Sequence, residues 1–323
     1  MLGRWASERV RTGIESSLER LGVRFDVWTS EGAIHAAGWV ERGIARLREA
    51  GLMYEDEGAL WFRSTAFGDD KDRVVIRSNG RPTYFAADIG YVAEKFSRGF
   101  DELIYIWGAD HHGTVARNRA AAIGLGFDAD AVRWPLIAWV RFVRDGVEIP
   151  MSKRSGEFIT LDDLLNEVGV DAARWYFSSR AYTSGIDFDL ELAKKQSNEN
   201  PVYYVQYAHA RAASILRNGA VAGLSPDGSR TAELLQHPAE QALLRHLLDF
   251  SDALAIAAER RETHEVPRYM YELASAFSGF YRDCKVLTED EALSSARLAL
   301  VDATRSVLAN GLDLLGISAP DSM

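Results

Sequence analysis

The sequence predicts an α/β domain followed by an all-α helical bundle. Between residues 89 and 143, helix-like segments alternate with apolar strand-like segments, a pattern typical of parallel strands in a doubly wound half-domain. After residue 160 the apolar residues recur at three- and four-residue spacing with no clear strand, which indicates helices. A length of 323 residues accommodates two domains of this kind.

The composition is that of a soluble globular protein. Hydrophobic residues make up 47% of the chain and charged residues 26%, which is enough for a substantial core. A single cysteine, Cys284, excludes a disulfide framework and a cysteine-based zinc site. We find no apolar span of membrane length and no signal-peptide pattern, so we expect no membrane partner and a cytoplasmic location.

The net charge of −10 argues against a generic binder of polyanions. Any contact with nucleic acid would have to come from local patches that act against the overall field. A shape-specific RNA partner remains compatible with this charge.

The N-terminal part is predicted to be helical before short strands begin. Apolar spacing predicts helices over residues 4–21 and 33–50, each followed by a glycine. Residues 74–77 and 83–85 predict a β-hairpin, because the intervening Asn79-Gly80 pair supplies positive φ at both turn centres.

The next segments build the α/β pattern. We expect a helix over residues 89–97, a strand over 103–107, a second helix over 114–123 and a second strand over 136–143. Strand–helix–strand alternation with apolar strands implies that the two strands pair in parallel.

The C-terminal part carries three apolar stripes at helical spacing. Their members are Val205, Ala208, Ala212 and Ile215; Met270, Ala274, Phe277, Tyr281 and Cys284; and Val301, Thr304, Val307, Leu308, Gly311 and Leu315. Residues 218–230 are rich in Gly, Ser, Pro and Asp and predict a connection between helices. We place a domain boundary near Asn200-Pro201, where a helix restarts with proline in its first turn.

The first motif with chemical meaning is Gly108-Ala-Asp-His-His-Gly113, at the end of a predicted strand. In open parallel sheets ligands lie beyond the carboxyl ends of strands, where a glycine admits a flat base and Asp110 can accept hydrogen bonds from ribose hydroxyls. The alternative is an ordinary strand-to-helix turn with Asp110 as the N-cap. A metal site is less favoured, because adjacent histidines point to different sides and no companion ligands are suitably spaced.

The second motif is Tyr84-Phe-Ala-Ala-Asp88. At a helix start, Tyr84 and Asp88 share one face, and a carboxylate can hold a guanidinium by two hydrogen bonds. This predicts a pocket for a planar cationic group. The alternative is a solvated Tyr/Asp pair.

The third motif, Glu148-Ile-Pro-Met-Ser-Lys-Arg-Ser-Gly156, follows the strand predicted over residues 136–143. Lys153 supplies a point charge, Ser152 and Ser155 supply small donors, and Gly156 supplies hinge freedom, which together suit the phosphates of a nucleotide triphosphate. The alternative is an exposed turn.

The fourth motif, Asn200-Pro-Val-Tyr-Tyr-Val-Gln-Tyr-Ala-His-Ala-Arg211, places aromatic residues and a basic residue on one helix. Such a helix can stack unpaired RNA bases, although Tyr and Val at helical spacing are more often core residues.

Together, these segments resemble bacterial arginyl-tRNA synthetases. The segments that carry the resemblance are Phe25-Asp-Val-Trp, Phe67-Gly-Asp-Asp-Lys-Asp-Arg73, Thr83-Tyr-Phe-Ala-Ala-Asp-Ile, Trp107-Gly-Ala-Asp-His-His, Met151-Ser-Lys-Arg-Ser-Gly, Val168-Gly-Val-Asp-Ala-Ala-Arg, the fourth motif and Gly311-Leu-Asp-Leu-Leu-Gly-Ile-Ser-Ala-Pro. They occur in the family's order and span almost the whole chain. The resemblance implies a class I enzyme that uses ATP, with Mg²⁺ as its counter-ion, to form arginyl-adenylate and then transfers arginine to its tRNA.

The resemblance also implies a division of the chain into four parts. Residues 1–80 would form a connective region of the catalytic domain, and 81–160 the second half of its Rossmann-like fold with the Met-Ser-Lys loop. Residues 161–200 would form a helical junction and 201–323 an all-helical anticodon-binding domain.

The site residues implied by the resemblance fall into four groups, with no protein-bound metal. Arginine would be held by Tyr84, Asp88 and His112; ATP by Gly108, Asp110, His111, Met151 and Lys153; catalysis would depend on Ser152 and Lys153; and tRNA would contact Tyr207, Arg211 and Met323.

The sequence departs from the family pattern in three places. Pro150 replaces the first lysine of the second signature, and Ala138 stands where a glutamine is expected. The family's first signature, His-Ile-Gly-His, has no match, and Gly32-Ala-Ile-His35 is not that motif. We therefore expect an incomplete catalytic fold with an exposed sheet edge, and no independent activity. The chain would be a truncated synthetase, one subunit of a split synthetase completed by an N-terminal half, or a non-catalytic tRNA-binding paralogue.

Overall fold

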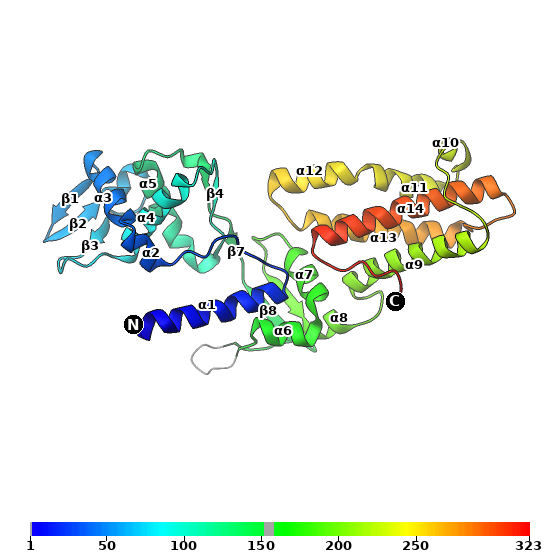
Figure 1. Cartoon of the computed structure of the whole chain (residues 1–323), viewed down its shortest axis with the longest axis horizontal. Coiled ribbons are helices and arrows are strands. Elements are labelled where there is room, and N and C mark those ends of the chain that lie inside the picture. The colour runs from blue at the N-terminus through cyan, green and yellow to red at the C-terminus, as the bar shows by residue number, and fades with distance from the viewer. Residues whose placement is uncertain (1, 152–157) are drawn as a thin grey trace. The chain divides into compact units, whose positions relative to one another are not determined.

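The computed structural model describes residues 2–151 and 158–323. The chain divides into two compact units. The central unit comprises Phe25–Trp139, and the composite unit comprises Met1–Arg24 together with Val140–Met323. Figure 1 labels the elements of both units.

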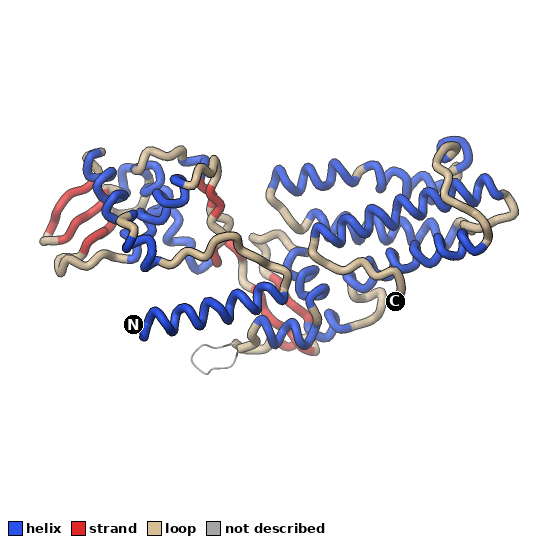
Figure 2. The backbone as a smooth tube through the Cα atoms, viewed as in Figure 1, coloured by secondary structure: helices blue, strands red, loops and turns tan. Residues whose placement is uncertain are grey.

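The central unit begins with two helices, α2 (Glu31–Ala36) and α3 (Trp39–Glu49). The sequence predicted a single helix here, and this expectation was wrong because Gly38 adopts a left-handed conformation with φ 72° between the two helices. A three-stranded antiparallel sheet follows, in the order β1 (Met53–Asp56), β2 (Ala59–Phe62) and β3 (Arg73–Ile76). The short 3₁₀ helix η1 (Ser64–Phe67) lies between β2 and β3. Figure 2 shows this sheet beside the helices of the unit.

The hairpin predicted over residues 74–85 does not form. Strand β3 pairs with β2, and only a single bridge joins Ile76 to Pro82. Of the two turn residues, only Gly80 has positive φ, and helix α4 (Tyr84–Ser97) begins where the second strand was expected. The helix prevails because a helical repeat buries Phe85 and Ile89 together in the core of the unit.

The parallel pairing predicted for the α/β segment is confirmed. Strand β4 (Leu103–Ile104) pairs in parallel with β6 (Val132–Arg133), and β5 (Trp107–Gly108) pairs in parallel with β7 (Leu136–Ile137). The expected strands are shorter and interrupted, since residues 103–108 form two strands and residues 136–144 form β7 and β8.

Two connections in this segment are short 3₁₀ helices. The helix η2 (Ala109–His111) leads into α5 (His112–Gly124), and η3 (Ala129–Ala131) precedes β6. The expected helix over residues 114–123 therefore corresponds to α5.

The composite unit contains a small mixed sheet. Strand β8 (Val140–Arg144) pairs with β9 (Val147–Glu148) in antiparallel fashion and with β10 (Ile186–Asp189) in parallel. Strand β10 contradicts the expectation that no strand follows residue 160. Its alternation of Ile186 and Phe188 with aspartates buries Phe188 completely, and this two-residue period is the signal that was missed.

Helices form the rest of the composite unit. They are α1 (Leu2–Arg20), α6 (Leu161–Val168), α7 (Val170–Ser178), α8 (Leu190–Lys194), α9 (Pro201–Val221), α10 (Thr231–Leu234), α11 (Pro238–Leu248), α12 (Phe250–Arg260), α13 (Glu265–Asp283) and α14 (Glu291–Leu314). Helices α9, α11, α13 and α14 pack on one another (Figure 1). None of the helices in the described ranges is both long enough and apolar enough to cross a bilayer.

The three predicted stripes form much of the bundle core. Val205, Met270, Phe277, Val301 and Leu308 are completely or almost completely buried. Two members behave differently, because Val307 is half-buried and Tyr281 is 45% exposed. The predicted proline in the first turn of α9 is confirmed.

Candidate functional site

Helix α4 presents four polar or aromatic side chains along one face. Tyr84, Asp88, Tyr91 and Lys95 are separated by four, three and four residues, so they line one side of the helix. Tyr84 is 79% exposed at the start of the helix, and the next three side chains are half-buried. The Tyr/Asp face predicted from the sequence is therefore present, and it extends for two further turns.

Asp88 is a carboxylate in a partly desolvated position. Burial raises the pKa of its carboxyl group above the usual range, while a hydrogen bond with Asn118 and the positive charge of Arg117 act in the opposite direction. The remaining charges that act on it are Glu31 of α2, which raises its pKa, and Lys95, which lowers it. A cation that binds here would offset the unfavourable burial of the charged form, so the position suits recognition of a positive group.

The far end of this face is aromatic. The Lys95 ammonium lies 3.8 Å from the ring centre of Tyr105 and 4.2 Å from that of Tyr91. Burial, followed by the charge of Arg98, lowers the pKa of Lys95 to about 8. Tyr105 also contacts Trp107 and Trp134, with ring centres 5.6 and 5.7 Å away, so this end of the α4 face is enclosed by rings.

The motif between β5 and α5 forms a turn around Gly108. A Cβ atom at Gly108 would lie 2.5 Å from Oδ1 of Asp110, so the Asp110 carboxylate folds back over the glycine. Asp110 and His111 are both more than half exposed, and their nearest charged atoms are 3.9 Å apart. No side chain caps α5, so the alternative reading of Asp110 as an N-cap does not hold. His112 is exposed and is the first residue of α5.

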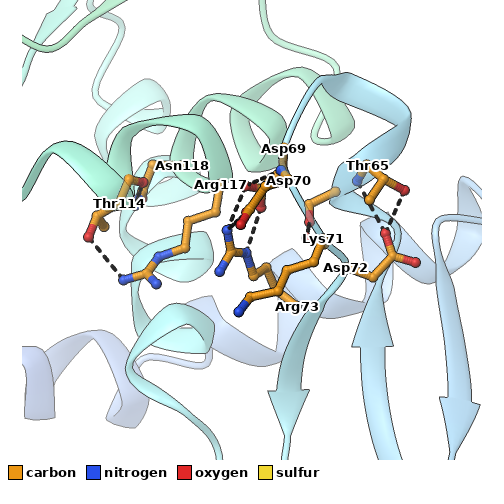
Figure 3. A network of polar contacts seen from close by, with 10 residues as sticks. Thr65, Asp69, Asp70, Lys71, Asp72, Arg73, Thr114, Arg117 and Asn118 are labelled. Carbon is orange, nitrogen blue, oxygen red and sulfur yellow. Dashed lines mark hydrogen bonds and ion pairs between the residues drawn. The ribbon is translucent and has the colours of Figure 1, made fainter.

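Figure 3 shows a polar network, part of which lies on α5 itself. Arg117 donates from Nη2 to Oγ1 of Thr114 over 3.1 Å, and Asn118 donates from Nδ2 to the Thr114 carbonyl oxygen over 3.1 Å. Within the described ranges, the buried Nε of Arg117 has no hydrogen-bond partner. Both side chains come from the same turn of α5 and act on Asp88 from the next helix.

The Phe67–Arg73 motif contributes the second half of this network. Arg73 holds the buried Asp69 by two 2.6 Å hydrogen bonds, from Nε to Oδ2 and from Nη2 to Oδ1. Asp72 accepts hydrogen bonds from the hydroxyl and the backbone N–H of Thr65, which lies in η1. Since η1 packs on α5, the motif lies beside the helix that carries Arg117 and Asn118.

The composite unit brings Tyr207 and Arg211 together on α9. The Arg211 guanidinium lies 4.6 Å from the ring centre of Tyr207 and 4.8 Å from that of Tyr281 on α13. Tyr203 stacks in parallel on Tyr207 at 6.2 Å. Sequence reasoning placed Tyr281 in an apolar core stripe, and its spacing gave no sign that its ring reaches the surface beside Arg211.

The remaining predicted residues divide between the units. Tyr84, Asp88, Gly108, Asp110, His111 and His112 belong to the central unit, whereas Met151, Tyr207, Arg211 and Met323 belong to the composite unit. Met151 is 44% exposed and Met323 is 51% exposed. Ser152 and Lys153 lie outside the described residues.

One cluster within the described ranges has metal-ligand chemistry. Ligand atoms of Glu262, His264 and Glu265 lie within 4.8 Å of one another at the start of α13. Glu265 also accepts a 3.0 Å hydrogen bond from Arg268, which supplies a positive charge of its own. Neither His111 nor His112 belongs to the cluster.

Sequence and structure comparisons agree with this architecture. Residues 5–179 match the family model described as tRNA synthetases class I (R), catalytic domain, and residues 205–323 match the DALR anticodon binding domain. The match to the catalytic domain covers more than half of the chain. The fold therefore combines a class I catalytic region with a helical anticodon-binding domain.

Individual relatives point in the same direction. The arginine–tRNA ligases of Heliobacterium modesticaldum and Moorella thermoacetica are 49% and 50% identical over the whole of this chain. A solved Campylobacter jejuni structure, described as an arginyl-tRNA synthetase, superimposes with a TM-score of 0.89 at 35% identity, covering 100% of this chain and 70% of that one. The chain belongs to the arginyl (R) family of class I tRNA synthetases. It spans 58% of the length of the two curated relatives.

Proposed function

We propose that the chain is part of an arginine–tRNA ligase, which activates arginine with ATP and transfers it to tRNA. The observation that carries this proposal is that one chain matches both a class I (R) catalytic domain and an anticodon-binding domain. The chain spans 58% of the length of its curated relatives, so the proposed reaction includes a complementing N-terminal half. Residues 201–323 would be the anticodon-binding domain.

Asp88 is the proposed receptor for the side chain of arginine. Its half-buried carboxylate lies on α4 and is acted on by Asn118 and Arg117 of α5, and a guanidinium can bind it there through two parallel hydrogen bonds that further offset the cost of burial. Tyr84, one turn earlier on the same face, and His112, at the start of α5, would line the rest of the arginine site.

The end of β5 is the proposed site for the adenosine of ATP. Gly108 lies at the carboxyl end of a parallel strand, where ligands of open sheets bind, and Asp110 and His111 follow it with exposed polar groups. Met151, Ser152 and Lys153 are the proposed contacts of the ATP phosphates, with Mg²⁺ as the counter-ion of ATP. In the proposed first step, a carboxylate oxygen of arginine attacks the α-phosphorus and pyrophosphate leaves, while Lys153 stabilises the developing negative charge.

The surface around Tyr207 and Arg211 is the proposed contact for tRNA. A guanidinium held between two tyrosine rings keeps free N–H groups for phosphates and bases, and the rings offer faces for stacking. Met323 would complete this surface. In the second step, a ribose hydroxyl at the 3′ end of tRNA attacks the carbonyl carbon of the adenylate, and AMP leaves.

Two narrower assignments remain inside this proposal. In the first, the chain is one subunit of a split synthetase and acts when it is completed by a separate N-terminal polypeptide. In the second, it is a paralogue that binds tRNA without catalysis. A single buried cysteine, Cys284, accords with a cytoplasmic location.

The test is arginine- and tRNA-dependent exchange of pyrophosphate into ATP. The chain is assayed alone and mixed with the N-terminal portion of a full-length relative that carries the first signature. We expect exchange only in the mixture. Asp88→Asn should then weaken arginine binding by at least tenfold with little change for ATP, whereas Asp101→Asn, an exposed aspartate of the same unit, should change neither. Absence of exchange in the mixture, together with retained tRNA binding, would replace the ligase assignment with the paralogue.

A further inference from the structure

The C-terminal segment, residues 315–323, is held against helices α7 and α9 of the composite unit. Its backbone accepts or donates hydrogen bonds at Leu315, Ser318, Pro320 and Asp321. All of these bonds involve side chains of α7 or α9. The segment therefore packs as part of the unit over most of its length.

Asp171 of α7 is the centre of these contacts. Its Oδ1 accepts the backbone N–H of Ser318 at 3.1 Å, and its Oδ2 accepts a short hydrogen bond from the Ser318 hydroxyl. The same Oδ2 accepts Nε2–H of Gln206 at 2.8 Å, and Gln206 also donates to the Ser318 carbonyl oxygen at 2.9 Å. One carboxylate thus joins α7, α9 and the C-terminal segment. Because the Asp171 side chain is only half-buried, its charge is not fully removed from water, and both oxygens accept these hydrogen bonds at a small desolvation cost.

Arg174, one turn further along α7, holds the start of the segment. It donates from Nε to the Leu315 carbonyl oxygen at 2.5 Å and from Nη1 to the Leu21 carbonyl oxygen at 2.7 Å. Gly316 adopts φ 65°, and a Cβ atom there would lie 2.5–2.6 Å from the Arg174 guanidinium. The chain turns at this glycine and passes from α14 toward Asp171.

Beyond Ser318 the segment continues along α9. The buried His209 contacts the Pro320 carbonyl oxygen through Nδ1 at 2.9 Å, and Arg217 donates to the Asp321 carbonyl oxygen at 3.1 Å. Gln206 immediately precedes Tyr207, so their side chains project about 100° apart around the helix. The C-terminal segment therefore lies on the face of α9 that adjoins the face carrying Tyr207 and Arg211.

We propose that Asp171 is a positioning residue for tRNA binding, which fixes the C-terminal segment beside the Tyr207–Arg211 face so that the two form one preorganised surface. The inference rests on the proposed function and adds to it a residue that does not itself touch RNA. A segment that is already ordered loses less conformational freedom when RNA binds, so the anchor increases affinity without adding a contact to the RNA. Sequence reasoning gave Asp171 no role, because its motif, Val168-Gly-Val-Asp-Ala-Ala-Arg, lies far from the anticodon-binding motif in the chain.

The anchoring step is measured by hydrogen exchange on the 323-residue chain, without any ligand. In Asp171→Ala we expect the amide of Ser318, which donates to Asp171, to exchange at least tenfold faster, while α11 and α13 stay protected. Asp302→Ala is the matched control, since Asp302 accepts a hydrogen bond from Arg305 on its own helix. Unchanged exchange of the segment in Asp171→Ala would overturn the anchor.

The RNA step is measured as the affinity for an arginine-accepting tRNA transcript. We expect Asp171→Ala to weaken binding by 5- to 20-fold, deletion of residues 321–323 to weaken it by a similar factor, and the two together to weaken it no more than the larger single effect. This lack of additivity is what an effect transmitted through the segment requires. The proposal would be overturned if the losses of tRNA affinity in the two single variants multiplied in the combined variant. It would also be overturned if a variant with fast hydrogen exchange in the C-terminal segment kept its full affinity for tRNA.

A second variant covers the case in which Asp171→Ala does not fold. Ser318→Ala removes only the hydroxyl that donates to Asp171 and leaves all helices intact. We expect faster hydrogen exchange of the C-terminal segment and a two- to threefold loss of tRNA affinity. In the complemented enzyme the KM for tRNA should rise while the rate at saturating tRNA is unchanged. If the unmodified chain binds no tRNA, the proposed function and the RNA role of Asp171 both fall; if it binds tRNA and only the variants fail to respond, the function stands and the positioning role falls.

Discussion

Replacing Arg73 by methionine should destabilise the central unit strongly. Arg73 donates two 2.6 Å hydrogen bonds to Asp69, whose side chain is only 1% exposed. Arg73→Met keeps most of the apolar stem and removes the charge, so Asp69 would stay buried without its counter-ion. The two side chains lie next to η1, which packs against α5.

The expected loss can be bounded from the geometry. Removing one partner of a buried ion pair costs about 3–5 kcal/mol. Asp69 keeps the backbone N–H of Asp70 at 2.9 Å, and Arg73 is 15% exposed, so we expect a loss of about 2–4 kcal/mol in the free energy of unfolding. With a urea dependence of about 2 kcal/mol per molar, the midpoint should fall by about 1–2 M.

The loss of stability in Arg73→Met should depend on pH through the ionisation of Asp69. Arg73 holds the pKa of the Asp69 carboxyl below its usual range, so the pair contributes stability above pH about 4 that is lost as the pH falls further. In Arg73→Met the same carboxyl loses its counter-charge and keeps only the hydrogen bonds with Ser64 and Asp70 against the effect of burial, so its pKa rises relative to the parent protein. The difference in stability between the two proteins should therefore be largest at neutral pH and shrink below pH about 5.

Tryptophan fluorescence during urea unfolding is a suitable assay, because six of the eight tryptophans lie in the central unit and only Trp5 and Trp175 lie outside it. Arg133→Met is the control, since its ion pair with Glu102 is exposed and should contribute about 0–1 kcal/mol. Equal midpoints for Arg73→Met and the parent protein at neutral pH would refute the reasoning.

Two further substitutions test the packing and the charge of α4. Gly90→Ala should lower the melting temperature of the central unit, because a Cβ atom at Gly90 would lie 2.8 Å from the backbone nitrogen of Val40. Overpacking of this kind costs about 1–3 kcal/mol, which is more than alanine gains in helix propensity. A higher melting temperature by calorimetry would contradict the close contact. Asp88→Asn should instead raise the melting temperature at neutral pH, because the folded-state pKa of Asp88 is raised. The cost of its buried charge therefore appears as the pH rises above the unfolded-state pKa and is complete above the folded-state pKa. The gain should vanish below pH about 4, and an Asn variant that is less stable than its parent at neutral pH would argue against the desolvated carboxylate.

The Asp88 prediction connects stability with the proposed activity. A carboxylate that is poorly solvated in the folded chain weakens the fold, yet the same property favours a guanidinium that restores its charge balance. Asp88→Asn should therefore stabilise the unit while weakening arginine binding. Phe62 and Ile89 are apolar and buried in the core of the same unit, so replacing them should not raise stability while weakening arginine binding.

Much of the site followed from local sequence. The four-residue spacing of Tyr84 and Asp88 is enough to place them on one helix face, and Gly108 and Asp110 follow a strand whose parallel pairing was expected from its apolar neighbours. The boundaries of helices and strands were harder to predict, because the local residue pattern and burial in the core sometimes favour different structures. Residues 84 and 85 have strand-like side chains, yet they belong to α4, since the buried Phe85, Ile89 and Val92 follow the four- and three-residue spacing of one helix face, which a strand would divide between its two faces.

Contacts between segments that are distant in the chain could not be predicted from the sequence. Tyr281 has the spacing of a core residue, and only the packing of α13 on α9 turns its ring toward Arg211. Asp171 and Ser318 are 147 residues apart, and no local pattern indicates that one carboxylate joins them to Gln206.

The sequence alone determined the fold class, the order of the chemical motifs and the helix faces on which they lie, because these depend on periodicity within a few residues. Tertiary structure decided which charges are desolvated and which side chains meet. The burial of Asp69, the raised pKa of Asp88 and the anchoring of the chain end by Asp171 arise from the packing of elements far apart in the sequence, and that packing is settled by the balance of burial over the whole unit rather than by any local preference.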